Sequence, residues 1–343
     1  MSADPSGPVA GRRPRGGRVL VALAAFVLLA LLQFHQPPRF LFAERSPVPV
    51  PPALVDARPA PDAFGRSGHV AVRFAFPGEV ADFPIEIQGD PSRVTYAWEP
   101  VGDTLQPVAS TLPRPIGTGQ MVAPDAPGFY RLVLSGGGYS RRIETVSLGV
   151  MVPFGEKRGS RLNGYLIGTY RGERSRASEP THPDGFIEIR PEYLELPLTA
   201  HLTVGDFVTH DGQETWPRYA ALDTRLLDKI ELVIDEIASW HGGQDRLDVT
   251  LDVHSGFRTP LYNRRVPRSA LDSRHQFGDA ADLAIDANAD GQLNLVDARL
   301  VSLAVEIVER EHPDLVGGLG LYALGGQSYV HVDARGTRAR WQG

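Results

Sequence analysis

An apolar run from residue 19 to residue 34 constrains where every later part of this chain can fold. Arginines stand directly before the run, at positions 12, 13, 15 and 18. The run is at the short end for a bilayer-spanning helix, which takes about 17–25 residues. Basic residues beside an apolar segment stay on the cytoplasmic side. The pattern predicts a cytoplasmic basic tail over residues 1–18, a single inner-membrane anchor over residues 19–35, and a folded periplasmic or extracytoplasmic remainder.

A cleaved signal peptide is the alternative interpretation of the same run. Its apolar core takes about 7–15 residues and is followed by a small-residue cleavage site. No such site follows here, because the run leads into Gln33-Phe34-His35-Gln36-Pro37-Pro38. We therefore favour the uncleaved anchor. Residues 36–66 are rich in proline, which indicates either an extended spacer or an unstructured linker.

The bulk composition excludes several classes of protein. The length of 343 residues allows two domains of roughly 100–200 residues each. A net charge of -6 argues against a nucleic-acid partner, which needs a basic face. Because the chain has no cysteine, it has no disulfide framework, thiol nucleophile, thiolate metal ligand or lipid-modified N-terminal cysteine.

The middle of the chain predicts two regions made of short strands. Residues 67–150 contain alternating segments, such as 69–76 and 131–134, separated by glycine and proline. This spacing predicts an all-β immunoglobulin-like sandwich, which serves as a spacer or as a ligand-binding surface. Residues 151–204 predict a connecting subdomain with strands over 162–170 and 185–189.

The last part of the chain, residues 205–343, predicts a mixed α+β domain. An amphipathic helix spans residues 223–240, with Asp223 as its N-cap and glycines at positions 242 and 243 at its end. Leu226, Ile230 and Val233 share its apolar face. An alternating strand follows over residues 247–253.

Three residues of this domain have the side chains of a metal site. His275 and Asp282 are separated by a short loop that contains Gly278, and His331 lies in a later strand-like stretch. A catalytic zinc takes three protein ligands and a water, and imidazole and carboxylate are both suitable ligands. Arg258 is placed to neutralise a substrate carboxylate or an oxyanion. The pattern predicts a zinc site of His275, Asp282 and His331.

The motif around these residues resembles a known family. Ser273-x-His275-x-x-Gly278-x-Ala280-x-Asp282, followed by His331-x-Asp333, is similar to the zinc D-Ala-D-Ala carboxypeptidases and murein endopeptidases, which share a fold with hedgehog signalling domains. Ser255-Gly-Phe-Arg258 with Asn263 is similar to the upstream segment of that family. The resemblance covers residues 205–343. It implies an antiparallel sheet with helices, zinc as cofactor, and peptidoglycan stem peptides or cross-links as substrate, with Arg258 and Ser273 as substrate-contacting residues.

One position departs from the family pattern. Many members carry an acidic general base three residues before the last ligand histidine, and Ser328 stands there in this chain. Asp333 and His254 both remain candidates for acid–base catalysis. The departure keeps a second hypothesis open, a non-catalytic zinc-containing binding protein of the cell envelope.

A second metal loop follows the first motif directly. The segment 286–297 matches the calcium-loop pattern, except that aspartate replaces the final glutamate. A strand over 281–285 precedes the segment and a helix over 296–311 follows it, so no full EF-hand is expected. The alternative is a solvated Asp/Asn-rich turn. The oxygen ligands of a structural calcium would be Asp286, Asn288, Asp290, Gln292 (through its carbonyl), Asn294 and Asp297.

Overall fold

The computed structural model describes residues 57–60, 63–87, 90–102, 112–117, 120–174, 182–242, 250–324 and 327–343. The anchor expected over residues 19–35 and most of the proline-rich linker lie outside these ranges. Within them, no helix is long and apolar enough to cross a membrane. Residues from Val50 to Gly343 form one compact unit.

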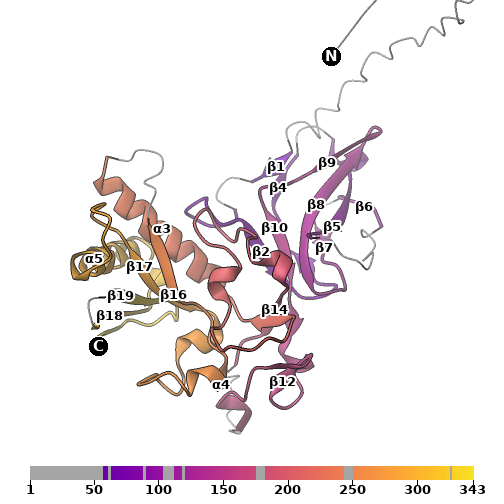
Figure 1. Cartoon of the computed structure of the whole chain (residues 1–343). Helices are drawn as coiled ribbons and strands as arrows, with labels where there is room; N and C mark the ends of the chain where they lie inside the picture. Colours follow the sequence, from indigo (N-terminus) through magenta and orange to yellow (C-terminus); the bar gives the residue numbers. More distant parts are fainter. Residues whose placement is uncertain are drawn as a thin grey trace, which may run out of the picture. The chain divides into compact units, whose positions relative to one another are not determined.

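The described chain is of the mixed α+β class, dominated by sheets, with few helices (Figure 1). This confirms the expected fold class at that level. Short 3-10 helices lie between the larger elements: η1 (Pro91–Arg93), η2 (Phe154–Glu156), η3 (Gly172–Arg174), η4 (Pro191–Tyr193), η5 (Gly205–Phe207), η6 (Arg274–Phe277) and η7 (Pro313–Leu315).

A six-stranded sheet forms the first part of this unit. Its order is β2-β10-β8-β5-β6, and β9 pairs with β8. The strands β1 and β4 form one small separate pair, and β3 and β7 form another. Trp98 is fully buried in the core between these pieces, where its ring meets Phe83 edge-on. The strands are β1 (Arg58–Pro59), β2 (Val72–Ala75), β3 (Val80–Ala81), β4 (Ile85–Glu86), β5 (Thr95–Pro100), β6 (Arg114–Pro115), β7 (Met121–Val122), β8 (Gly128–Gly136), β9 (Tyr139–Arg142) and β10 (Ser147–Val150).

A three-stranded sheet joins two strands of the connecting region, β11 (Val152–Pro153) and β14 (Gly185–Ile189), to β15 (Arg218–Ala220), which comes later in the chain. The strand predicted over 185–189 is therefore confirmed. The single strand expected over 162–170 is wrong, because β12 (Arg161–Leu162) and β13 (Tyr165–Leu166) form a tight hairpin instead. Asn163 and Gly164 both have positive φ and reverse the chain between them.

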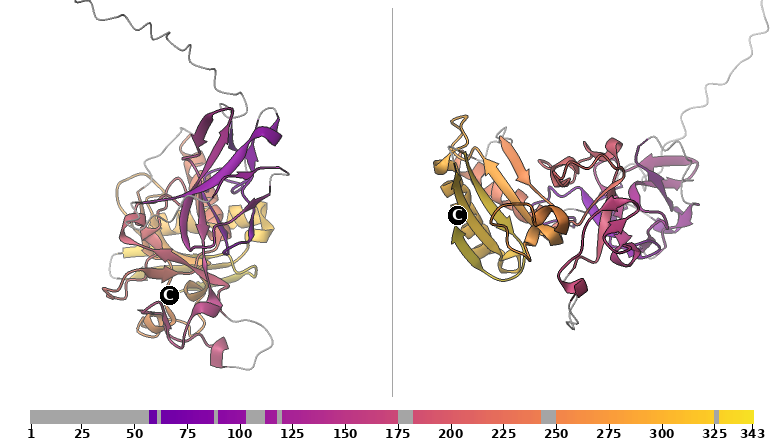
Figure 2. Two further views of the ribbon diagram at one scale, coloured as in Figure 1. Left: turned by 90° about the vertical axis from the view of Figure 1, so that its right-hand side faces the viewer. Right: turned by 60° about the horizontal axis from the view of Figure 1, so that its bottom comes forward.

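The C-terminal part is a five-stranded sheet with the order β16-β17-β19-β18-β20. Its strands are β16 (Leu251–Ser255), β17 (Ala280–Ile285), β18 (Gly318–Leu324), β19 (Gln327–Asp333) and β20 (Ala339–Gln342). The helix α5 (Leu295–Glu311) packs on β17, β18 and β19, and α3 (Thr224–Trp240) packs on α5 (Figures 1 and 2). The short helix α4 (Pro260–Asn263) follows β16.

Both long helices begin where the sequence predicts. The Asp223 side chain accepts a hydrogen bond from the backbone N–H of Arg225 and caps α3. Asn294 and Asp297 form a capping box at the start of α5. The strand expected over 247–253 begins at Leu251, and residues 243–249 lie outside the described ranges.

Consecutive residues of α3 hold different parts of the structure. The Asp228 carboxylate accepts hydrogen bonds from the backbone N–H groups of Arg66 and Ser67, each at 3.0 Å. The fully buried Lys229 donates to Glu309 Oε1 of α5 and to the backbone oxygen of Asp333, each at 2.7 Å. The helix therefore links the start of the described chain to the end of β19.

Candidate metal centre

Three separate elements bring the predicted ligands together. His275 lies in η6, Asp282 in β17 and His331 in β19, where Asp282 and His331 are direct cross-strand neighbours. Gly278 turns the chain from η6 into β17 with φ 78°. A Cβ at this position would lie 2.2 Å from the carbonyl carbon of Ala221, so only glycine fits here.

The ligand atoms of the three residues face one another. His275 Nε2 lies 3.2 Å from Asp282 Oδ1 and 3.1 Å from His331 Nδ1, and the last two atoms are 2.9 Å apart. The residues are 1%, 6% and 6% exposed, respectively. Among the described residues, this is the one group that brings three such ligand atoms within 4.8 Å. The group could hold a metal ion.

The second nitrogen of each histidine is held by another group. His275 Nδ1 lies 2.7 Å from the backbone oxygen of Gly256. His331 Nε2 lies 3.2 Å from Asp333 Oδ2. Outer partners of this kind fix the tautomer and the ring orientation of a metal ligand. They leave His275 Nε2 and His331 Nδ1 as the free ligand atoms, and these are the two atoms that meet Asp282.

The two imidazoles differ in their affinity for a proton. Burial lowers the pKa of His275 below its usual value. Burial also opposes the charged form of His331, but its hydrogen bonds to Asp282 and Asp333 outweigh burial and raise its pKa. Asp282 is buried as well, yet the neighbouring His275 and His331 hold its pKa well below the usual range. Asp282 is therefore ionised throughout the neutral range.

Arg258 also contacts this group. Its guanidinium hydrogen-bonds Asp282 Oδ2, and its Nε donates to Ser255 Oγ at 2.7 Å. The carboxylate of Asp282 thus faces the two imidazoles through Oδ1 and the arginine through Oδ2. Ser273 is half-buried at the start of η6, two residues before His275.

The two acid–base candidates occupy different places. Asp333 is fully buried and touches His331 on the side away from its free nitrogen; it also accepts hydrogen bonds from Arg335 and from the backbone N–H of Gly318. His254 is partly exposed, and its ring centroid lies 5.2 Å from that of Tyr329. Tyr329 stands two residues before His331 in β19, so His254 lies beside the face of the sheet that carries the ligands.

Ser328 points away from the ligand group. It stands three residues before His331 within the regular strand β19, and residues an odd number apart in a strand point to opposite faces. A carboxylate at this position would therefore not reach the group.

Aromatic residues that the sequence reasoning missed surround the group. The indole of Trp341 in β20 lies 5.1 Å from the His331 ring, and its Nε1 donates to the Tyr322 hydroxyl at 2.7 Å. Tyr322 stacks on Tyr329 at 4.8 Å. Gly320 lies between His331 and Trp341 in register, so no side chain separates the two rings. The period of two places Tyr329 with His331, but no sequence signal places Trp341.

The loop after β17 has the predicted surroundings, a strand before it and a helix after it. Asp286 accepts hydrogen bonds from the backbone N–H groups of Asp290 and Gly291. Asp297 accepts from those of Ala287, Asn288 and Asn294. The two carboxylates thus hold the backbone of the loop in place. This arrangement identifies neither calcium nor any other ion.

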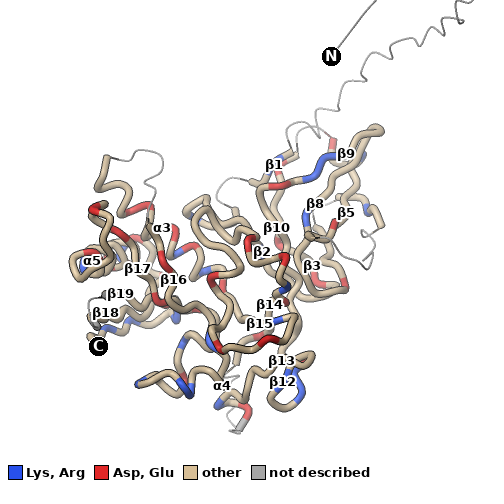
Figure 3. The backbone as a smooth tube through the Cα atoms, in the orientation of Figure 1, with Lys and Arg blue, Asp and Glu red and all other residues tan. Residues whose placement is uncertain are grey.

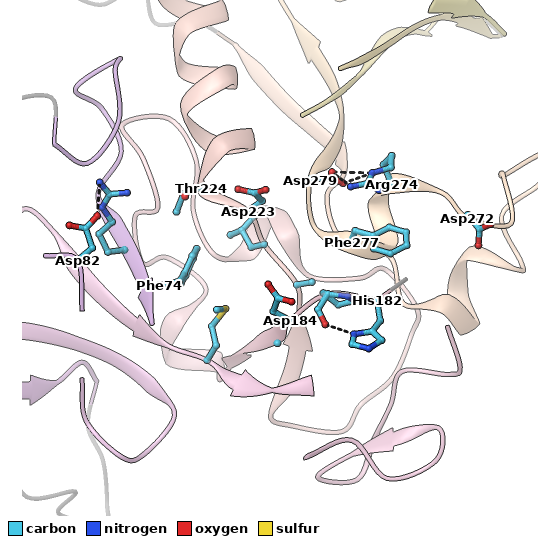
Figure 4. A pocket seen from close by; sticks show the side chains of 16 residues that line it. Phe74, Asp82, His182, Asp184, Asp223, Thr224, Asp272, Arg274, Phe277 and Asp279 are labelled. Carbon is cyan, nitrogen blue, oxygen red and sulfur yellow. Dashed lines mark hydrogen bonds and ion pairs between the residues drawn. The ribbon is translucent and has the colours of Figure 1, made fainter. Parts of the chain in front are cut away.

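A separate cavity of about 700 Å³ adjoins η6, the short helix that carries His275 (Figure 4). Arg274 and Phe277 of η6 line it, whereas His275 of the same helix joins the ligand group. Arg274 pairs there with Asp279. Asp184 and Asp223 line it as well, so the cavity is predominantly acidic and distinct from the ligand group.

Comparison with protein-family models, with curated proteins and with solved structures finds no match for the chain. The functional interpretation therefore depends on the residues and their geometry.

Proposed function

We propose that this protein is a zinc-dependent peptidase of the cell envelope that hydrolyses peptide bonds in peptidoglycan stem peptides or cross-links. The observation that carries the proposal is the buried group of His275, Asp282 and His331, whose ligand atoms converge. Its resemblance in motif to the zinc D-Ala-D-Ala peptidases supplies the substrate class.

The spacing of the ligand atoms is compatible with zinc. Tetrahedral zinc with bonds of about 2.0–2.1 Å separates its ligand atoms by roughly 3.3 Å. The three separations of 2.9, 3.1 and 3.2 Å are within a few tenths of an ångström of that value. Two neutral imidazoles and one ionised carboxylate are a common ligand set for a catalytic zinc.

The surrounding residues suit hydrolysis of an amide. Zinc in such a site supplies a water whose pKa is lowered to about 7. Arg258, beside Asp282, is positioned to stabilise negative charge on the carbonyl oxygen. His254 is our candidate for moving a proton, because it is partly exposed beside the ligand face. Asp333 is our candidate for orienting His331 rather than for acid–base catalysis.

The location and the second metal belong to the same proposal. The basic, apolar and proline-rich segments at the N-terminus support an inner-membrane anchor with the peptidase outside the cytoplasm. The loop 286–297 supports a structural calcium through the oxygen ligands of Asp286, Asn288, Asp290, Gln292, Asn294 and Asp297. Because the loop directly follows β17, calcium would stabilise the strand that carries Asp282.

One observation favours a second candidate, a zinc-containing binding protein without turnover. Asp333, the carboxylate next to the ligand group, is already engaged by His331 and Arg335. If His254 does not transfer protons, the site would bind a peptide without cleaving it.

Digestion of purified peptidoglycan distinguishes the two candidates. The full-length chain in mild detergent should release peptides or single amino acids, and His275→Ala, Asp282→Ala and His331→Ala should each abolish both release and zinc content. Zinc binding without any product would favour the binding protein. Full zinc occupancy in the His331→Ala variant would refute the ligand assignment.

A further inference from the structure

The loop between α4 and η6 presents a cluster of free positive charge. Arg264, Arg265 and Arg268 are exposed, and no carboxylate of the described chain lies within ion-pair distance of them. Figure 3 shows blue basic positions along the backbone beside α4. We call residues 264–272 the arginine loop.

Such a cluster is unusual in this molecule. The chain carries a net charge of -6, and many of its described arginines pair with carboxylates. Even the acid at the end of the arginine loop, Asp272, is taken up by Arg171 at 2.6 Å. The loop therefore leaves three guanidinium groups free to bind an external anion.

Hydrogen bonds from two buried side chains and one partly buried side chain hold the loop in place. Asn263, which is 1% exposed, donates from Nδ2 to the backbone oxygen of Ala270 at 2.9 Å. Ser269 Oγ donates to the backbone oxygen of Asn263 at 2.6 Å. Gln276, the residue after His275, donates to the backbone oxygen of Leu271 at 2.9 Å. The loop is thus anchored to the same short helix that carries a candidate metal ligand.

We infer that the arginine loop is a docking surface for the free carboxylates of peptidoglycan stem peptides next to the peptide being cleaved. This inference rests on the proposed function. Guanidinium groups bind carboxylates with two parallel hydrogen bonds. One exposed ion pair contributes little, but a polymer that repeats its carboxylates engages several at once. Leu271, which is 75% exposed on the same loop, adds an apolar contact.

Co-sedimentation with insoluble peptidoglycan tests the inference. The full-length chain in mild detergent is mixed at low ionic strength with untreated peptidoglycan and with peptidoglycan whose carboxyl groups have been amidated. The test variant is Arg264→Gln/Arg265→Gln/Arg268→Gln. The matched control removes the same charge at exposed arginines elsewhere, Arg114→Gln/Arg299→Gln/Arg310→Gln. Zinc content and melting temperature verify that both variants fold.

The expected result is a loss of apparent affinity on the order of tenfold for the loop variant, little change for the control, and a similar loss for the unaltered chain on amidated peptidoglycan. Equal sedimentation of the loop variant and the control would overturn the inference. So would binding that amidation of the carboxyl groups leaves unchanged. Peptide release by the unaltered chain is scored separately: its absence would refute the peptidase, whereas sedimentation alone decides the docking surface.

Discussion

Replacing Asp333 with asparagine tests whether this buried carboxylate orients a metal ligand. Asp333 Oδ1 accepts from the backbone N–H of Gly318 at 2.7 Å, and Oδ2 lies 3.2 Å from His331 Nε2. If the asparagine oxygen keeps the bond to Gly318, its NH₂ group faces an imidazole N–H. The ring must then rotate, or its proton must move to Nδ1, which is the atom needed for the metal. Loss of such an outer partner costs about 10–100-fold in metal affinity, or about 1.4–2.7 kcal/mol.

Zinc affinity measured by competition with a chromogenic chelator gives this quantity directly. Asp279→Asn is the matched control, because Asp279 is also a buried carboxylate paired with an arginine, Arg274, but its side chain does not contact the ligand group. We expect the control to retain nearly its full affinity. If Asp333→Asn folds and binds zinc as tightly as the control, Asp333 does not orient His331.

Three further perturbations follow from the geometry. A Cβ in Gly320→Ala would lie 2.3 Å from Trp341 Nε1, so overpacking should lower the free energy of unfolding by about 1–3 kcal/mol in denaturant titrations; unchanged stability and tryptophan fluorescence would contradict this. Calcium at a hundredfold excess over its dissociation constant should stabilise the protein by about 2.7 kcal/mol. Asp290→Ala should remove the resulting rise in melting temperature while zinc stays bound. A melting curve that does not change with calcium would show that the loop is a solvated turn. The raised pKa of His331 keeps it protonated further into the neutral range, so zinc affinity should rise with pH through that pKa. Calorimetry in two buffers should detect the proton that zinc binding releases from His331. If no proton is released, His331 is not a ligand.

Local patterns were sufficient to predict much of the C-terminal part. The period of 3.6 and the cap at Asp223 place α3, and the helix expected over 296–311 after the loop matches α5 within one residue. The convergence of His275, Asp282 and His331 was also predicted, because each side chain belongs to one motif. These features depend on residues close in sequence or on a known combination of ligands.

Other features depend on contacts between distant segments and could not be predicted. The hairpin at Asn163 is not such a feature: its Asn-Gly pair is a local turn signal, which favours a turn more strongly than the flanking apolar residues favour a continuous strand. The sequence makes Asp333 an acid–base candidate, whereas its contact with the outer nitrogen of His331 follows only from the place of β19 in the sheet. The approach of Trp341 to His331 likewise requires the parallel pairing of β18 with β20.

The helix α3 has a mechanical consequence for the whole unit. Asp228 holds the segment at Arg66 and Ser67, which comes directly from the proline-rich linker, and Lys229 holds the end of the strand that contains His331. A pull on that linker would therefore be transmitted within one residue of the helix to the backbone beside a candidate metal ligand, His331. If α3 unfolds, both attachments are lost in a single step, so the linker junction and the group of His275, Asp282 and His331 should share one unfolding transition.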